Sequence, residues 1–330
     1  MRGPNKLLAA TLPAFLALRG RQSLSILNYH RVLAEPDPMR PDEPDSATFR
    51  WQMKLLADYF HPVGLEEAVI RLSQGSLPER AVCVTFDDGY ADNAEVAAPI
   101  LEALNIPATI FVATGFINGG LMWNDTIMEF ARIAAAGTYH AGKFELSIPE
   151  AAGYDIRRLK AGALIREIKH LPVAERQSLV DQLIACTQPL LPHDLMMNEA
   201  QLKELSTRDI QLGAHTVSHP ILASLDDNLA LKEITRSKSD LEAITGLPTR
   251  LFAYPNGKAN IDYLQQHCKM VAKAGFLAAV STQWGVARAD SDPYQLPRFT
   301  PWDKTPSRFL LRLMLNYHRK SDTDSKGFSL

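Results

Sequence analysis

Short runs of strand-forming residues alternate with longer stretches of helical periodicity along most of this chain, and this alternation limits the folds open to it. Residues 81–86 and 108–113 are compact apolar runs, and residues 91–104 between them have the apolar spacing of a helix. A strand, a helix and a strand in this order predict parallel strands joined by a right-handed crossover. The expected fold class is therefore α/β with a mainly parallel sheet.

The alternation continues along the chain with one interruption. Residues 118–205 are mostly helical in pattern and poor in strand formers, so we expect a helical insertion or lid there. The whole pattern predicts a (β/α) barrel or a relative of it. The expected strands are residues 23–32, 81–86, 108–113, 210–214, 250–254 and 277–280, and the expected helices are residues 49–60, 65–72, 91–104, 228–245, 261–274 and 307–317.

Length and charge exclude several classes of function. The 330 residues are 46% hydrophobic, which is enough to bury the core of one large domain, expected over residues 23–318. The 35 basic residues nearly balance the 37 acidic ones, so no overall positive field attracts nucleic acid or an anionic membrane. No stretch is long and apolar enough for a membrane span. A neutral or small substrate fits this composition better, and the oligomeric state stays open.

The ends of the chain and its cysteines bear on the compartment. Residues 1–22 contain a moderately apolar stretch that resembles a signal peptide, but Pro13 interrupts it and no small-residue cleavage pattern follows. We favour a short amphipathic helix there. The three cysteines are far apart and favour a reducing, cytoplasmic compartment. A periplasmic or extracellular location follows instead if residues 1–22 act as a signal. The polar tail, residues 319–330, is expected to fray.

Two adjacent carboxylates, Asp87 and Asp88, end the apolar run at residues 81–86. Adjacent carboxylates repel each other unless a cation lies between them or one of them is protonated. The alternative is an ordinary Asp-Asp-Gly turn. The loops at the carboxyl ends of parallel strands form the sites of α/β folds, so a second polar cluster at another strand end would favour the cation.

Such a cluster follows the predicted strand at residues 210–214. His215 and His219 are four residues apart, and this spacing places two histidines on one side of a helical turn, close enough to share a metal ion. A lone histidine would more often be a core or surface residue. Two imidazoles and one carboxylate leave coordination positions open, as in catalytic metal sites, and the other carboxylate is then available as a base.

Two further segments are candidates for substrate binding. Tyr254, Pro255 and Asn256 follow the next predicted strand, where a Pro-Asn-Gly turn would aim a backbone N–H into the site. Trp123 and Asp125 open the helical insertion and would line a sugar cleft. Ordinary turn chemistry is the alternative for the first segment, and core packing is the alternative for Trp123.

His30 and His318 each lie in an Asn-Tyr-His-Arg tetrapeptide. His30 ends a predicted buried strand, whereas His318 lies in the last turn of a terminal helix, where a basic residue complements the helix dipole. We therefore take His30 as a candidate site residue and His318 as structural.

With these residues identified, the chain resembles the polysaccharide deacetylase family, the NodB-homology domain of carbohydrate esterase family 4. Residues 85–89 (Thr-Phe-Asp-Asp-Gly) resemble its first motif, residues 215–219 its second (His-Ser/Thr-x-x-His), and residues 252–257 stand where its third lies. The resemblance covers roughly residues 23–301. It implies a distorted (β/α)7 barrel and a hydrolase that removes N-acetyl groups from amino sugars of a polysaccharide or glycan precursor.

The resemblance also implies the role of each motif residue. Asp88, His215 and His219 would hold a divalent metal, usually zinc. Asp87 would be the catalytic base that takes a proton from the attacking water. A backbone N–H near Asn256 would stabilise the oxyanion, and a histidine would protonate the departing amine.

Two departures from the family pattern assign two more residues. Ala253 stands where the third motif normally carries an arginine that orients the base, so Arg298, from a later loop, is expected to be the bidentate partner of Asp87. No Leu-x-His motif follows the late strands. His30 instead resembles the subgroup that deacetylates poly-N-acetylglucosamine, in which a Tyr-His segment precedes the first motif. We expect His30 to be catalytic.

Other functions stay open on the same residues. The fold and the metal do not define the acyl group, so another amide or an O-acetyl ester is an alternative substrate. A catalytically silent glycan-binding module is a second alternative, although a binder has no need of a base beside the metal. A phosphoaspartate phosphatase is excluded by spacing, because such enzymes use Asp-x-Asp and here the two acids are adjacent.

Overall fold

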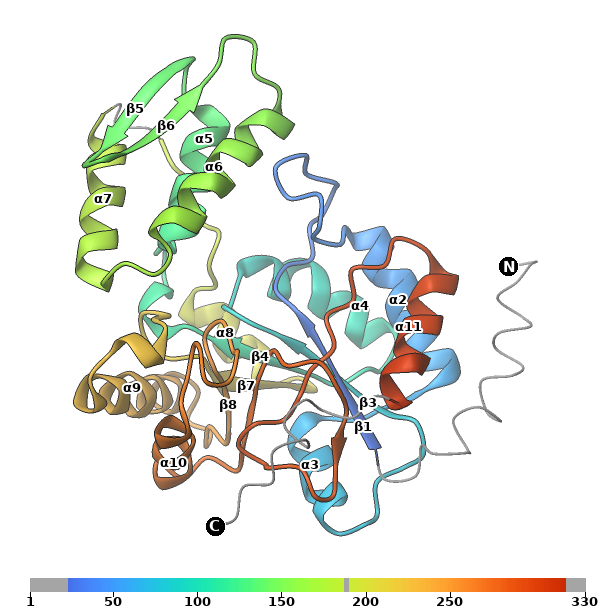
Figure 1. Ribbon diagram of the computed structural model, residues 1–330. Helices are drawn as coiled ribbons and strands as arrows, with labels where there is room; N and C mark the ends of the chain where they lie inside the picture. Colours follow the sequence, from blue (N-terminus) through green and yellow to red (C-terminus); the bar gives the residue numbers. More distant parts are fainter. Residues whose placement is uncertain (1–22, 187–189, 319–330) are drawn as a thin grey trace.

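The computed structural model describes residues 23–186 and 190–318, so the expectations for residues 1–22 and 319–330 lie outside the described part of the chain. A curled sheet lies at the centre, with helices packed around it (Figure 1). Neighbouring strands of this sheet are parallel, except that β10 runs antiparallel to β1. Their order is β10 (Ala287–Arg288), β1 (Ser23–Tyr29), β3 (Ala81–Phe86), β4 (Ala108–Val112), β7 (Ile210–Ala214), β8 (Leu251–Ala253) and β9 (Ala278–Val280), and β2 (His61–Pro62) pairs with β3.

The gap between β9 and β1 is closed by an irregular segment, residues 296–299. Leu296 exchanges backbone hydrogen bonds with β9, and Phe299 exchanges them with β1. The sheet therefore curls into an incomplete barrel, and the segment that closes it is not a regular strand. Arg298 lies on this segment, between Leu296 and Phe299. The expected distorted barrel is confirmed, and its distortion lies where Arg298 enters the site.

The central strands are apolar on both faces because both faces are covered. In β1 and β3, Leu27 and Val84 belong to one apolar cluster, whereas Ile26 and Cys83 belong to another. Strands buried on both faces form continuous apolar runs rather than alternating ones. This explains why β3 could be predicted with its observed bounds.

Helices cover the outside of the sheet, and α2 and α11 lie against each other on one side of it (Figure 1). The helix expected over residues 91–104 begins with a wide π-helical turn, Asn93–Ala97. The helix expected over residues 261–274 begins later, because Lys258 N donates to the Asp262 carboxylate in a preceding turn. The helices are α2 (Ser46–Tyr59), α3 (Leu65–Ser73), α4 (Ala98–Ala103), α8 (Glu199–Leu205), α9 (Asp227–Thr245), α10 (Gln265–Lys273) and α11 (Pro306–His318), with 3-10 turns at Thr114–Phe116 and Leu222–Ser224.

A separate group of elements, which we call the lid, stands beyond the carboxyl ends of the strands (Figure 1). It consists of α5 (Trp123–Ile133), β5 (Gly137–Ala141), β6 (Phe144–Ile148), α6 (Tyr154–Ile168) and α7 (Val173–Ala185). The lid has its own apolar cluster, which includes Phe130, Leu146 and Leu183. The expectation of an insertion poor in strands is wrong for β5 and β6, an antiparallel hairpin turning at Gly142.

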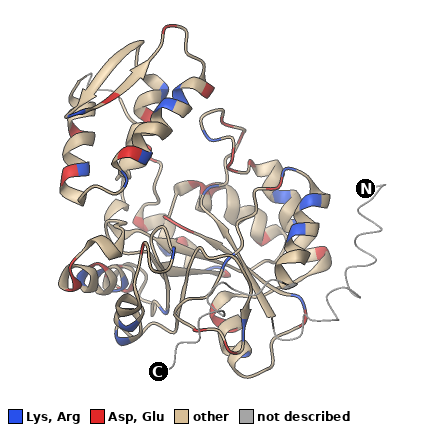
Figure 2. Cartoon of the chain, in the orientation of Figure 1, with Lys and Arg blue, Asp and Glu red and all other residues tan. Residues whose placement is uncertain are grey.

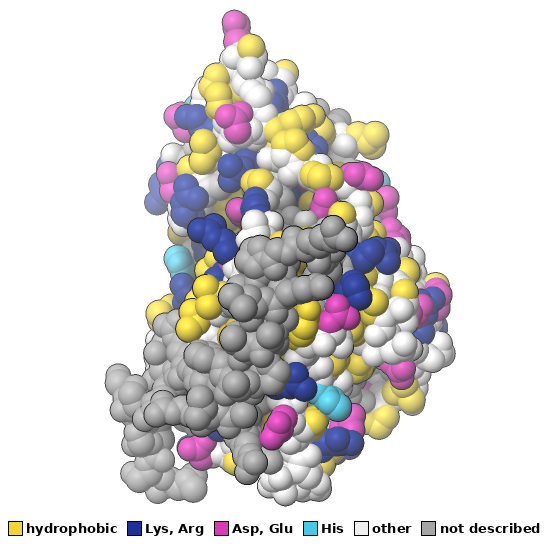
Figure 3. All heavy atoms as spheres, turned by 90° about the vertical axis from the view of Figure 1, so that its right-hand side faces the viewer, with side chains coloured by type: hydrophobic (Ala, Val, Ile, Leu, Met, Phe, Trp, Pro, Cys, Tyr) yellow, Lys and Arg dark blue, Asp and Glu magenta, His cyan; other side chains and the backbone are white. Residues whose placement is uncertain are grey.

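The described part of the surface carries no large patch of charges of one sign. Acidic and basic side chains are interspersed over the helices in Figure 2. They are likewise mixed with apolar ones on the part of the face in Figure 3 that is not grey. Within residues 23–186 and 190–318, no helix has the length and apolarity needed to cross a membrane.

Candidate active site

The two adjacent carboxylates are separated by a change of backbone direction at the end of β3. Asp87 N donates to the Tyr29 carbonyl (2.9 Å), which extends the pairing of β1 with β3 by one residue. Asp88 then adopts a left-handed conformation with φ of 76°, uncommon for a residue other than glycine. Gly89 follows at φ of 88°, packed so closely that a Cβ there would lie 3.0 Å from Val112 Cγ1. The Asp-Asp-Gly sequence is thus a turn, and it also buries both carboxylates.

His215 and His219 lie in a loop after β7. The expectation that they share a helical turn is wrong, because His219 and the intervening Thr216 have φ of 52° and 65°. Glu233 of α9 holds the loop in place. Its carboxylate accepts from Val217 N (2.8 Å), Ser218 N (2.9 Å) and Ser218 Oγ (2.8 Å).

Asp88, His215 and His219 converge on one point. Asp88 Oδ1 lies 3.4 Å from His215 Nε2 and 3.3 Å from His219 Nε2, and the three ligand atoms lie within 4.8 Å of one another. His215 Nδ1 donates to the Ala253 carbonyl (2.7 Å), so its Nε2 keeps a free lone pair. Asp88 Oδ1 is buried, and none of the described residues donates a hydrogen bond to it. A buried oxygen without a donor, facing two imidazole nitrogens, fits a divalent cation.

The electrostatics of the three ligands suit that reading. Burial lowers the pKa of His219 to about 4, so its imidazole is neutral near pH 7 and can offer a lone pair. Burial alone would raise the pKa of Asp88, but the nearby His219 and His215 outweigh this and hold it below its ordinary value. Asp88 therefore offers an anionic oxygen and His219 a neutral nitrogen.

Asp87 is paired with Arg298 rather than with the histidines. Arg298 Nη1 and Nη2 donate to the two oxygens of Asp87 at 2.7 and 2.6 Å, and Arg298 Nε donates to the Ser281 carbonyl (2.8 Å). Burial tends to raise the pKa of Asp87, but the charge of Arg298 outweighs it and the pKa is lowered. Asp87 is therefore an ionised carboxylate with a fixed orientation. The bidentate contact expected from the sequence is present in the structure.

His30 follows β1 and lines the same cavity. Its pKa is raised: burial alone would lower it, but the negative charges of Asp88, Asp87 and Glu43 outweigh that effect. Asn93 Nδ2 donates to the His30 carbonyl (2.9 Å), which fixes the backbone at this position. His30 is thus a candidate proton donor beside the two carboxylates.

The cavity around these residues measures about 420 Å³, and the lid forms part of its wall. Trp123 and Asn256 line it, and Trp123 also packs against the apolar cluster of the lid. Tyr254 does not line the cavity, because its ring stacks on Tyr263 in the core (3.9 Å between ring centres). Pro255 is buried and is likewise not among the lining residues, nor is Asp125. Both Asp125 oxygens are engaged, accepting from Arg40 Nη2 (2.8 Å) and Tyr90 Oη (2.8 Å).

Sequence reasoning missed several residues of this cavity. Glu43 comes from a proline-rich loop that gives no sign of its position, and Arg31 follows His30 with its side chain paired to Asp92 (2.7 Å). Lys169 and Arg176 come from the lid, whose placement over the strand ends is set by tertiary contacts. Only Arg31 had a local signal, the Asn-Tyr-His-Arg segment in which it lies.

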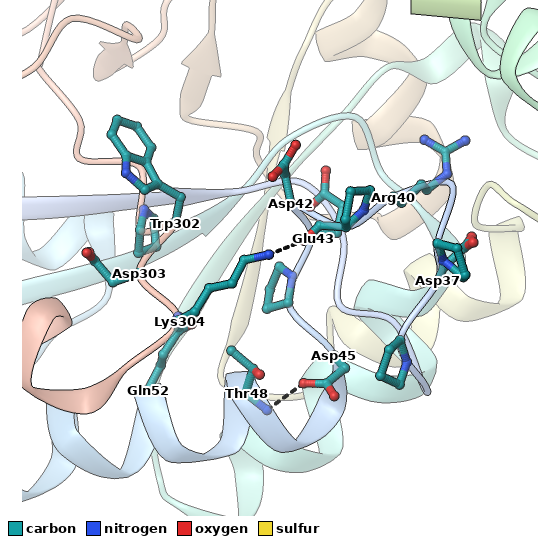
Figure 4. Close-up of a pocket in the computed structure, with 15 residues that line it drawn as sticks. Asp37, Arg40, Asp42, Glu43, Asp45, Thr48, Gln52, Trp302, Asp303 and Lys304 are labelled. Atoms are coloured by element: carbon teal, nitrogen blue, oxygen red, sulfur yellow. Dashed lines mark hydrogen bonds between the residues drawn. The ribbon is translucent and has the colours of Figure 1, made fainter. Parts of the chain in front are cut away.

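Loop 36–45 also lines a second cavity of about 370 Å³, which Figure 4 shows in close-up. Arg40 and Glu43 line both cavities. The loop is held from the far side by Lys304, whose Nζ donates to the Pro41 carbonyl (2.8 Å). At its end, Asp45 caps α2 by accepting from Thr48 N (2.8 Å). The loop that presents Glu43 to the site is therefore anchored at both sides.

Comparison with known proteins decides the family. The sequence pattern of the polysaccharide deacetylases matches residues 74–144 and 179–278, just over half of the chain. The chain belongs to the polysaccharide deacetylase family. This deacetylase is thus a hydrolase of carbon–nitrogen bonds, and the resemblance carried by its first two motifs is confirmed. The family pattern passes over residues 145–178, which lie in the lid.

This deacetylase resembles one curated protein in sequence and several solved structures in fold, all at low identity. YxkH of Bacillus subtilis (strain 168), provisionally named a polysaccharide deacetylase, is 24% identical over 276 residues, 83% of this chain and 70% of that protein. Streptococcus pyogenes deacetylase PplD, solved in complex with acetate, has a TM-score of 0.59 at 20% identity over 88% of this chain and 98% of its own. IcaB from Ammonifex degensii has a TM-score of 0.57 at 21% identity over 90% and 97%.

Proposed function

We propose that this deacetylase uses a divalent cation, with zinc preferred, to remove N-acetyl groups from amino sugars of a polysaccharide or glycan precursor. The observation that carries the proposal is the convergence of Asp88, His215 and His219 beside the Asp87–Arg298 pair in one cavity. Two imidazoles with one carboxylate is a ligand set that catalytic zinc sites use.

A cation held by Asp88, His215 and His219 would polarise the acetyl carbonyl and lower the pKa of the attacking water. Asp87, held ionised by Arg298, takes the proton of that water. The bidentate pairing leaves the carboxylate little freedom to rotate, so its free lone pairs keep one direction.

Two further residues complete the reaction. His30, whose pKa is raised by the surrounding carboxylates, gives a proton to the departing amine. A backbone N–H near Asn256, a residue in a left-handed turn that lines the cavity, would donate to the oxygen that becomes negative. The cytoplasmic location stays a prediction from the sparse cysteines.

The test is an amine-release assay on N-acetylglucosamine oligomers, with and without a chelator. We expect release by the wild type, loss on chelation, recovery on adding zinc, and loss in Asp87→Asn and His215→Ala. The control is His140→Ala, an exposed lid histidine away from the cavity. Release that survives both the chelator and His215→Ala would reject the proposal. Activity on acetylated xylan but none on N-acetylhexosamines would select an O-acetyl ester instead.

A further inference from the structure

A buried arginine from the lid faces the catalytic cavity. Arg176, in the first turn of α7, is 5% exposed and lines the cavity together with His219 and Trp123. Its guanidinium lies 4.5 Å from the centre of the Trp123 ring, and its Nη1 donates to the Lys169 carbonyl (3.0 Å). These contacts fix the guanidinium in place without neutralising it.

Arg176 differs from the other arginines of this cavity, since each of those is neutralised by a carboxylate. Arg31 is paired with Asp92 and Arg40 with Asp125, at 2.7 and 2.8 Å. Within the described part of the chain, no carboxylate forms an ion pair with Arg176, and burial lowers the pKa of its guanidinium with no acidic neighbour to offset it. A buried charge without a counter-charge is costly, and ligand anions commonly supply the missing partner.

A second cation lines the cavity beside Arg176. The half-buried Lys169, just after α6, also lines the cavity, and its carbonyl is the one that Arg176 contacts. The acidic residue of the cavity that the mechanism does not use, Glu43, has Arg31 and Arg40 as its cationic neighbours together with His30. Both lid cations fall within residues 145–178, which the family pattern does not match.

We propose that Arg176 and Lys169 form a subsite for an oxyanion carried by the glycan, a phosphate or a carboxylate, with the Trp123 ring beside it. The planar fork of the guanidinium matches two oxygens of either group. The inference rests on the proposed deacetylation and narrows its substrate to an anionic glycan. It also explains why a chain without an overall positive charge presents in its cavity two cations that form no ion pair with any described residue.

The test compares product-like ligands that the enzyme does not turn over. Calorimetric titration of the full-length, metal-loaded protein would use glucosamine, glucosamine 1-phosphate and muramic acid. We expect at least one anionic ligand to bind about 10-fold more tightly than glucosamine. A preference for the phosphate or for the carboxylate identifies the source of the oxyanion. Equal affinities for all three would overturn the proposal.

Variants show whether Arg176 and Lys169 cause the preference for the anionic ligand. Arg176→Gln and Lys169→Gln should each reduce the preference for the anion, whereas Arg166→Gln, an exposed lid arginine outside the cavity, should keep it. Lys169 is partly exposed, so its variant keeps the test open if Arg176→Gln unfolds. If the preference for the anion survives both substitutions, the anion binds at the metal site rather than at Arg176 and Lys169, and the proposal would be wrong.

Turnover separates this inference from the proposed function. With N-acetylated substrates, Arg176→Gln should lower kcat/KM by a larger factor for the anionic glycan than for the neutral one, whereas Arg166→Gln should leave both unchanged. If the wild type releases amine equally well from both, the subsite fails while the deacetylase stands. If no substrate is turned over, the proposed function fails, and the titrations still decide whether the subsite exists.

Discussion

At the scale of single residues, the site depends on giving two adjacent carboxylates different partners. Asp88 turns toward His215 and His219, whereas Asp87 faces the Arg298 guanidinium. Both carboxylates are buried, so each needs its own compensation. The left-handed backbone at Asp88 makes this division possible, because it turns neighbouring side chains toward different groups.

Removing Arg298 should leave the Asp87 carboxylate buried without a partner. We expect Arg298→Met to lower the free energy of unfolding by about 3–5 kcal/mol and to reduce kcat by ~10²-fold or more. The control is Arg250→Met, which breaks a more exposed pair with Glu66 and should cost about 0–1 kcal/mol. Chemical denaturation measures both. Equal costs for the two variants would contradict the account of Asp87.

Replacing His30 should separate proton transfer from metal binding. We expect His30→Ala to keep its metal and to lose ~10²-fold or more in kcat, because the departing amine lacks its proton donor. Metal analysis and amine release measure the two effects on the same sample. His318→Ala, in the second Asn-Tyr-His-Arg segment, is the matched control. Unchanged turnover in His30→Ala would remove His30 from the mechanism.

The motif residues could be predicted because each follows a strand whose apolar run is unmistakable. Tyr254 and Asp125 could not be placed in the same way. Successive side chains point to opposite faces at a strand end, and Tyr254 faces the aromatic core. Asp125 opens a helix whose orientation is set by Arg40 and Tyr90, which are distant in sequence. Proximity to a motif is therefore a weak guide to which side chain lines a cavity.

At the scale of elements, the histidine loop depends on α9. Glu233 accepts from three groups of the loop, so we expect Glu233→Ala to lower metal affinity about 10- to 100-fold without changing a ligand. Glu242→Ala on the same helix removes a contact with Thr249 N, away from the histidine loop, and is the control. Competition with a chromophoric chelator measures both affinities. If the Glu233 variant binds metal as tightly as the control, the histidine loop keeps its conformation without Glu233, and the prediction is wrong.

The lid is fastened to loop 36–45 by ion pairs, one of which responds to pH. Arg132 donates to both oxygens of Asp37 at 2.9 and 2.5 Å. Burial tends to raise the pKa of Asp37, but the hydrogen bonds from Arg132 outweigh it and the pKa falls below 3.8. The stability gained from this pair is therefore complete above pH 3.8 and is lost as the pH falls through the lower folded value.

Asp37→Asn should abolish this dependence. At pH 7 we expect it to lower the free energy of unfolding by about 1 kcal/mol, a modest figure because the pair is partly exposed. The gap between wild type and variant should shrink as the pH falls below 3.8. Denaturant titrations from pH 7 downward measure it. A gap that stays constant over that range would contradict the assignment.

At the scale of the whole molecule, the curled sheet brings together residues that are far apart in sequence. Asp87 and Arg298 are 211 positions apart and meet because residues 296–299 close the barrel between β9 and β1. The order of strands and helices could be predicted from periodicity. The lid hairpin and the lid cations could not, since their positions depend on packing between segments that no local pattern connects.

The most direct test of the shared cation site is the stoichiometry of zinc binding by the purified protein and its variants. We predict one equivalent for the wild type and for Asp87→Asn, and loss of tight binding in Asp88→Ala, His215→Ala and His219→Ala. Zinc retained at full affinity by all three ligand variants, or lost in Asp87→Asn alone, would contradict the division of labour between the two carboxylates.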